Sequence, residues 1–63
     1  MTAAQFRRAL LELGLDTQED AARVLGISRR TVIRHFADET PVPLYVQRLI
    51  ELLRRYGIPK EFR

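Results

Sequence analysis

The sequence predicts an all-α fold, a compact bundle of four or five short helices. Three observations predict it: apolar residues recur at intervals of three and four in four stretches, capping residues precede these stretches, and glycine or proline follows most of them. The 63 residues are 46% hydrophobic and 30% charged, which is typical of a globular chain. We therefore expect one domain over residues 1–63.

The first helix is expected between Thr2 and Gly14. Thr2 can cap it, with Gln5 three residues later as the second member of a capping box. Gly14 is a plausible end for the helix. The apolar residues on its inner face are Phe6, Ala9, Leu10 and Leu13.

Two short helices are expected within residues 17–37. Asp16 or Thr17 caps the second helix, which ends at Gly26. Ser28 then caps the third helix, which runs to about Ala37. The predicted buried residues are Ala21, Ala22, Val24, Leu25, Val32 and Phe36.

Residues 38–43, with the sequence DETPVP, predict a loop. Pro41 and Pro43 push the residues before them towards extended conformations, so no helix crosses this segment. Pro43 suits the first position of a fourth helix over about residues 43–56, which Gly57 and Pro59 end. Its predicted apolar face consists of Val46, Leu49, Ile50 and Leu53.

Residues 18–37 carry the strongest functional signal. Small Ala22, turn-forming Gly26 and apolar Val32 stand at the spacing that two helices crossing near a right angle require. Gly26 lies where the backbone needs a positive φ angle. With these residues the stretch resembles the helix-turn-helix of the phage repressor and Cro-like (XRE-type) family. Val42-Pro43 stands where small regulators of this family often have a similar dipeptide.

The resemblance implies a sequence-specific transcriptional regulator, a repressor that occupies an operator in the DNA major groove. Phage and mobile-element repressors belong to the family, including small autoregulators encoded beside anti-CRISPR genes. The implied partners are double-stranded DNA and a second copy of the chain. No cofactor, metal or small-molecule effector is expected.

The resemblance places the base contacts on the third helix. Arginine presents a planar fork that matches the O6 and N7 acceptors of guanine, and an aliphatic side chain can pack on a thymine methyl group. Residues 28–37 contain three arginines, one histidine and no acid. The alternative is that these arginines form only a solvated face. The predicted base contacts are Arg29, Arg30, Ile33 and Arg34.

The predicted contacts to the DNA backbone are Thr17, Gln18, Ser28, Thr31 and His35. The family commonly has a large apolar or aromatic residue where this chain has His35, so we expect Phe36 to take over the core role. His35 is then either packed with one ring nitrogen hydrogen-bonded or in contact with a phosphate. Arg23 is expected to be a surface residue or a partner of Glu19, four residues earlier, rather than a DNA contact.

A homodimer is expected because a single short recognition helix supplies few contacts to DNA. Its predicted interface is a stripe on the fourth helix formed by Tyr45, Leu49, Leu52 and Tyr56. The alternative is that this stripe is covered within the chain by Leu15, or by Ile58 and Phe62 of the segment that follows the helix.

Other functional classes find little support in the sequence. The chain has no cysteine, and its single histidine has no second histidine or cysteine with which to bind zinc. Neither a positioned nucleophile nor a glycine-rich phosphate loop is present, so no enzyme is expected. The net charge of +3 is only a weak sign of nucleic-acid binding.

The sequence shows no signal peptide and no membrane-spanning run, so a cytoplasmic, nucleoid-associated protein is expected. The alternative function is a protein-interaction module built on a helix-turn-helix scaffold, with weak or no DNA binding. An antitoxin and a partner of RNA polymerase or a sigma factor are examples of such a module.

Overall fold

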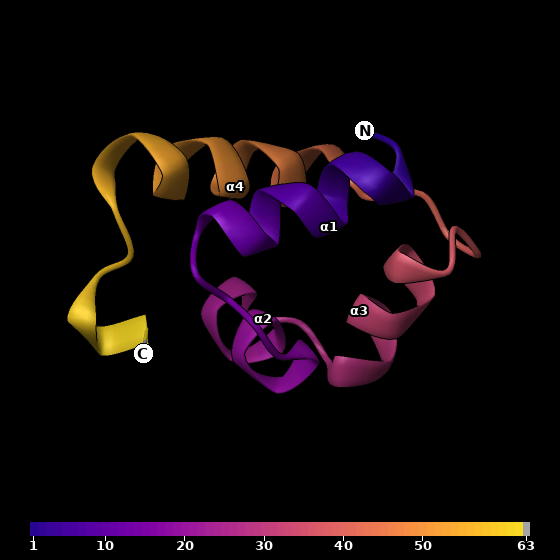
Figure 1. Cartoon of the computed structure of the whole chain (residues 1–63), viewed down its shortest axis with the longest axis horizontal. Coiled ribbons are helices and arrows are strands. Elements are labelled where there is room, and N and C mark those ends of the chain that lie inside the picture. Colours follow the sequence, from indigo (N-terminus) through magenta and orange to yellow (C-terminus); the bar gives the residue numbers. More distant parts are fainter. Residues whose placement is uncertain (63) are drawn as a thin grey trace.

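The computed structural model describes residues 1–62, and Arg63 lies outside the described residues. The described chain forms α1 (Ala3–Glu12), α2 (Gln18–Leu25), α3 (Arg29–Phe36), α4 (Leu44–Tyr56) and a final 3-10 turn, η1 (Lys60–Phe62). The predicted all-α fold is confirmed. α1 and α4 run alongside each other at one side of the molecule, and α2 and α3 pack beneath them (Figure 1).

The first three helices begin at predicted cap residues. The Thr2 hydroxyl accepts a hydrogen bond from the backbone N–H of Gln5 at 3.1 Å, and the Gln5 side chain accepts one from the Thr2 N–H at 2.8 Å. This is the predicted capping box. Thr17 caps α2 and Ser28 caps α3. α4 begins one residue later than predicted, because Pro43 is its N-cap and not its first residue.

Backbone geometry fixes the turn between α2 and α3, which spans residues 26–28. Gly26 adopts the predicted left-handed conformation, with φ 70° and ψ 28°. The N–H of Ile27 donates a hydrogen bond to the carbonyl oxygen of Ala22, five residues earlier, at 3.1 Å. This is the 6→1 hydrogen bond of a Schellman motif. The end of α3 has the same closure, with Asp38 as the left-handed residue at φ 61°. We call residues 18–36 the α2–turn–α3 unit.

The core lies between the four helices, and the predicted apolar faces of α1, α2 and α4 supply most of it. Leu13 and Leu49 are exceptions, since both are only half-buried. No helix within residues 1–62 has the length and apolar character needed to cross a membrane. The largest fully buried side chains are Phe6, Leu10, Val32, Val46 and Ile50.

The inner side of α3 differs from the prediction. His35 is 3% exposed, whereas Phe36 is half-buried. Both rings meet the Phe6 ring edge-on, with centroid separations of 5.4 Å for His35 and 5.7 Å for Phe36. His35 and Phe36 follow Val32 by three and four residues, so both lie on its side of the helix, and the rotation of α3 against Phe6 places His35 in the core position. Phe36 covers the edge of this packing.

Substitutions at Gly26 test the turn. A Cβ atom there would meet nothing within 4 Å, so any cost comes from the left-handed backbone alone. We expect Gly26→Ala to lower the free energy of unfolding by about 1 kcal/mol and Gly26→Val by more. Gly26→Asn should stay close to wild type because asparagine tolerates this conformation. Chemical denaturation gives the free energy of unfolding of each variant. Equal stability of the three variants would contradict the role given to the left-handed backbone of Gly26.

Candidate nucleic-acid interface

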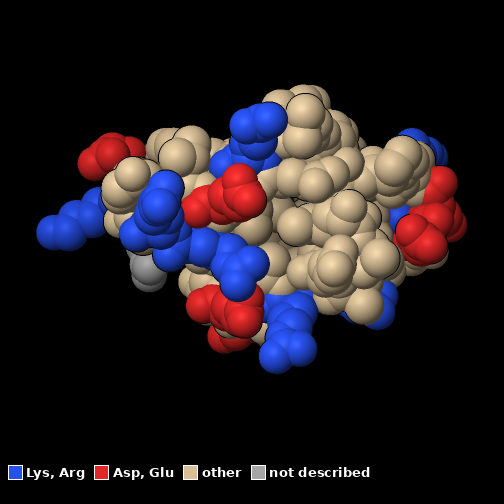
Figure 2. Space-filling view, turned by 90° about the horizontal axis from the view of Figure 1, so that it is seen from above, with Lys and Arg blue, Asp and Glu red and all other residues tan. Residues whose placement is uncertain are grey.

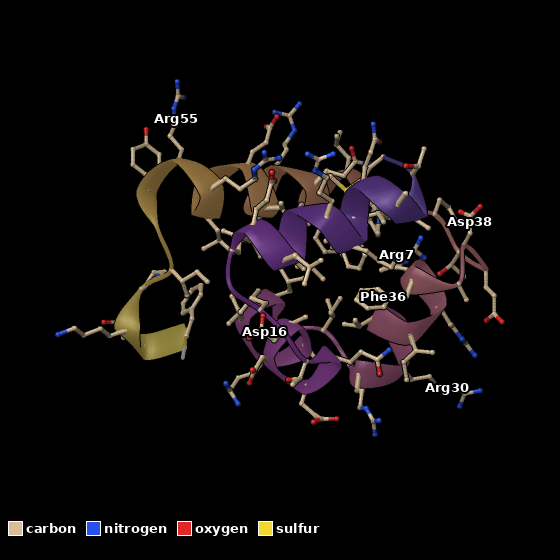
Figure 3. The ribbon with its side chains drawn as sticks, in the orientation of Figure 1. Arg7, Asp16, Arg30, Phe36, Asp38 and Arg55 are labelled. Carbon is tan, nitrogen blue, oxygen red and sulfur yellow. The ribbon has the colours of Figure 1, made fainter. Side chains whose placement is uncertain are left out.

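α3 turns two arginines away from the core. Val32 is fully buried and His35 nearly so, which fixes the side of α3 that packs on the protein. At about 100° per residue, Arg30 and Arg34 fall on the opposite side, one turn apart. Both residues are exposed. Figure 3 shows Arg30 pointing away from the body of the molecule, on the side opposite α4.

The four predicted base-contact residues have different surroundings. Arg30 and Arg34 make no ion pair within residues 1–62. Ile33, which lies on the same outer side, is 40% exposed. Arg29 is also exposed, but its Nε lies 3.0 Å from Oε1 of Glu19 in the first turn of α2. The outer face of α3 therefore presents two unpaired guanidinium groups beside an aliphatic side chain.

Arg23 is an exposed surface residue, as one of the two alternatives expected, but its partner is not Glu19. Nη2 of Arg23 lies 2.7 Å from Oδ1 of Asp20, one turn earlier on α2. Glu19 instead contacts Arg29 of the following helix. Helical spacing alone does not reveal this pair, because its two residues lie on different helices and meet only through the turn between them.

Most of the predicted backbone contacts lie where α2 and α3 begin. Thr17 and Ser28 are exposed, and each hydroxyl accepts a hydrogen bond from a backbone N–H of the first turn. Gln18 and Thr31 are half-buried, and the Thr31 hydroxyl lies 2.8 Å from that of Ser28. The peptide N–H groups and dipole at such helix ends favour an anion such as phosphate.

His35 does not belong with these residues. Its Nδ1 lies 3.1 Å from the carbonyl oxygen of Thr40 and 3.2 Å from the Thr40 hydroxyl. Its Nε2 is enclosed and has no hydrogen-bond partner in the described part of the chain. A ring enclosed in this way does not reach a phosphate, so we withdraw His35 from the DNA contacts. Its role is to join α3 to the loop before α4.

Arg7 of α1 holds the last turn of α3. Its Nη1 donates a hydrogen bond to the carbonyl oxygen of Phe36 at 2.6 Å, and Figure 3 shows the two residues close together between the helices. Carbonyl groups at the end of a helix lack partners within the helix and carry partial negative charge. Arg7 supplies both a donor and a positive charge there.

The stripe predicted as a dimer interface remains largely exposed. Tyr45 is 69% exposed, Leu52 54% and Tyr56 76%, whereas Leu49 is half-buried. Leu49 packs partly against the core and lines a hollow together with Phe62 of η1, whereas the other three residues of the stripe stay uncovered within residues 1–62. Leu15 is buried in the core.

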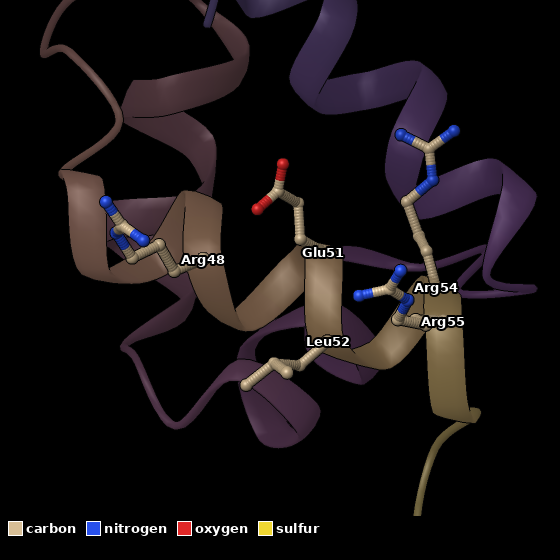
Figure 4. Close-up of a pocket in the computed structure, with 5 residues that line it drawn as sticks. All are labelled: Arg48, Glu51, Leu52, Arg54 and Arg55. Atoms are coloured by element: carbon tan, nitrogen blue, oxygen red, sulfur yellow. The ribbon is translucent and has the colours of Figure 1, made fainter.

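The outer surface of α4 carries a cationic hollow next to this stripe (Figure 4). Arg54 is one of its cations and binds Glu12 of α1 at 2.9 Å. Arg55 points away from the molecule on the side opposite Arg30 (Figure 3). Figure 2 faces this surface and shows charged side chains gathered where α4 ends, beside a continuous uncharged area where α1 and α4 begin. The residues that line the hollow are Arg48, Glu51, Leu52, Arg54 and Arg55.

No family model matches the chain, and no curated protein or solved structure matches it. Within residues 1–62, no group of three histidine, cysteine or acidic side chains is placed to hold a metal ion.

Arg7→Met tests whether α1 holds the end of α3. Methionine keeps an unbranched apolar chain but removes the donor and the charge, so we expect the free energy of unfolding to fall by about 1 kcal/mol. Arg8→Met is the matched control, because the Arg8 side chain is 83% exposed and its ion pair with Glu12 is long at 4.0 Å. Its effect should stay below about 0.5 kcal/mol. Equal losses in denaturant titrations of the two variants would contradict the role given to Arg7.

Proposed function

We propose that the chain is a sequence-specific DNA-binding transcriptional regulator that places α3 in the major groove and represses by occupying its operator. One observation carries the proposal. Arg30 and Arg34 lie one turn apart on the outer face of α3, exposed and without an ion pair among the described residues. The α2–turn–α3 unit then acts as a helix-turn-helix, with α3 as its recognition helix.

The chemistry of the outer face supports this role. Each guanidinium offers a planar pair of donors that fits guanine O6 and N7, and Ile33 beside them suits a thymine methyl group. Some arginines elsewhere are used differently: Arg7 binds a backbone carbonyl, and Arg23 binds an aspartate. If these arginines only faced solvent, acidic neighbours on the same helix would reduce the repulsion between their charges, yet residues 28–37 contain no acid.

The phosphate contacts follow from the same placement. We assign them to Thr17, Gln18, Ser28 and Thr31, which lie at the starts of α2 and α3. Contacts of this kind fix the register of a protein on the duplex, while contacts to base edges read the sequence. The cations around Arg55 lie on the side opposite Arg30, so we assign them no contact with the same duplex.

Selection from a random duplex pool tests the function directly. We expect one sequence pattern to be enriched, and binding to any duplex to weaken steeply when salt is raised, because bound arginines displace counterions from the phosphates. A pool without enrichment, together with duplex binding that is insensitive to salt, would exclude the proposal. That result would favour a protein-interaction module on this scaffold.

We also propose that the chain acts as a homodimer through the stripe on α4. Tyr45, Leu49, Leu52 and Tyr56 read the same in both directions: Tyr, Leu, Leu, Tyr at spacings of four, three and four. When two such helices pack antiparallel about a two-fold axis, Tyr45 meets Tyr56 of the second copy and Leu49 meets Leu52. The stripe is thus complementary to itself, and a second copy of this chain is the partner that fits it.

The position of the stripe on α4 also suits a second copy. Val46, Ile50 and Leu53 are buried and mark the inner side of α4. Arg54 reaches Glu12 and marks the flank nearest α1. At about 100° per residue the stripe falls on the other flank, so α1 does not cover it.

Alanine substitutions on α3 test the base contacts. We expect Arg30→Ala and Arg34→Ala each to weaken binding to the selected site by about 1–3 kcal/mol, and to weaken binding to unrelated duplex clearly less. Arg55→Ala on the opposite side is the control and should change neither affinity. Fluorescence anisotropy titrations give these values. Equal losses on both duplexes would reassign the arginine to a phosphate contact.

Glutamate substitutions on α4 test the dimer. We expect the wild-type chain to sediment as a dimer at micromolar concentration, and the double variant Leu52→Glu, Tyr56→Glu to become monomeric with unchanged helix content, because it buries charges against a second copy. Leu11→Glu is the control, since Leu11 is 64% exposed on α1, outside the stripe. A monomeric wild type that binds a half-site as tightly as the full site would refute the dimer.

A further inference from the structure

Glu19 and Arg29 connect the first turns of α2 and α3. Oε1 of Glu19 lies 3.0 Å from Nε of Arg29, and both side chains are mostly exposed, at 64% and 61%. The other ion pairs within residues 1–62 join cations of α1, α2 and α4 to Glu12 or Asp20. Glu19 is therefore the one acid in the described chain that pairs with a cation of α3.

The contact leaves one edge of the guanidinium free. Arginine has five N–H donors in a rigid planar fork, and Glu19 engages the fork at Nε. The two terminal nitrogens can still donate together to O6 and N7 of a guanine. A long side chain held at one edge also loses less rotational freedom when its other edge binds. The pair thus orients Arg29 before DNA arrives.

The carboxylate has a second effect on DNA binding. Glu19 stands next to Gln18 at the start of α2, where we have placed phosphate contacts. A negative charge there repels every duplex, whatever its sequence, and it neutralises Arg29 as a phosphate contact. Only a duplex with a guanine within reach of the free edge of Arg29 regains the affinity that this repulsion removes. The carboxylate therefore raises the ratio of specific to non-specific affinity and lowers non-specific binding.

We infer that Glu19 determines specificity by positioning Arg29 for one guanine of the operator and by disfavouring duplexes that lack it. The inference rests on the DNA-binding function proposed above and adds a residue that contacts no base itself. It also gives the acid in the first turn of α2 a role that helix-dipole stabilisation alone does not explain, since Asp20 supplies the same stabilisation.

The neutral isostere Glu19→Gln tests the inference, with affinities measured on the selected site and on unrelated duplex. We expect unrelated duplex to bind several-fold more tightly, and its salt dependence to steepen by about one unit in the logarithmic slope. We expect the ratio of specific to non-specific affinity to fall on the order of tenfold, because Arg29 loses its orientation.

Asp20→Asn is the matched control. It removes the same charge from the same helical turn, but Asp20 pairs with Arg23 on its own helix. We expect it to strengthen binding to both duplexes alike and to leave their ratio unchanged. Thermal melts of the two variants should agree, since both lose one first-turn acid.

The background Arg29→Ala shows whether Glu19 acts through Arg29. In that background Glu19→Gln should no longer change the affinity ratio, because coupled residues are non-additive. A wild-type ratio in Glu19→Gln, or an effect that persists without Arg29, overturns the inference and leaves the proposed function standing. If the wild-type chain selects no sequence at all, the inference and the proposed function fall together.

Discussion

Phe6 determines where α3 lies. Its ring is fully buried and meets both His35 and Phe36 edge-on, and the adjacent Arg7 binds the carbonyl oxygen of Phe36. Burial of one phenylalanine contributes about 1.5–3 kcal/mol, a large share of the roughly 5–15 kcal/mol that separates folded from unfolded small domains. Because α1 holds the last turn of α3 from behind, the outer face of that helix stays clear of the core.

The placement of acids decides which arginines remain available. Arg23 and Arg54 are each within 3 Å of a carboxylate oxygen, whereas Arg30 and Arg34 have no ion pair among the described residues. Exposed ion pairs add only about 0–1 kcal/mol to stability, so their energetic role in the fold is small. Their larger effect is on the charge that each surface shows to a partner. Glu19 is the exception, since it brings an acid to the helix that is otherwise free of them.

Features set by local structure could be predicted from the sequence. The caps at Thr2 and Ser28 and the turn at Gly26 depend on hydrogen bonds and backbone angles within a few residues, and the outer position of Arg30 follows from helical period once Val32 is inside. Features set by the relative positions of helices could not. Whether His35 or Phe36 enters the core depends on how α3 is rotated against Phe6. The ion pair between Glu19 and Arg29 depends on the angle and distance at which α2 and α3 pack.

The short length of α3 limits how well one copy of the proposed regulator can discriminate between sites. Its eight residues make about two turns, and only Arg30, Arg34 and Ile33 point outward between its ends. Bidentate contacts from Arg30 and Arg34, with the one inferred for Arg29, at about 1–3 kcal/mol each separate the right site from wrong ones by roughly 10²-fold to 10⁶-fold. A genome offers about 10⁶–10⁹ competing sites, so this ratio is too small by itself. Two rigidly paired copies add their free energies and thereby square the ratio. In the proposed regulator, the dimer formed through the stripe on α4 therefore supplies the discrimination that the short α3 lacks by itself.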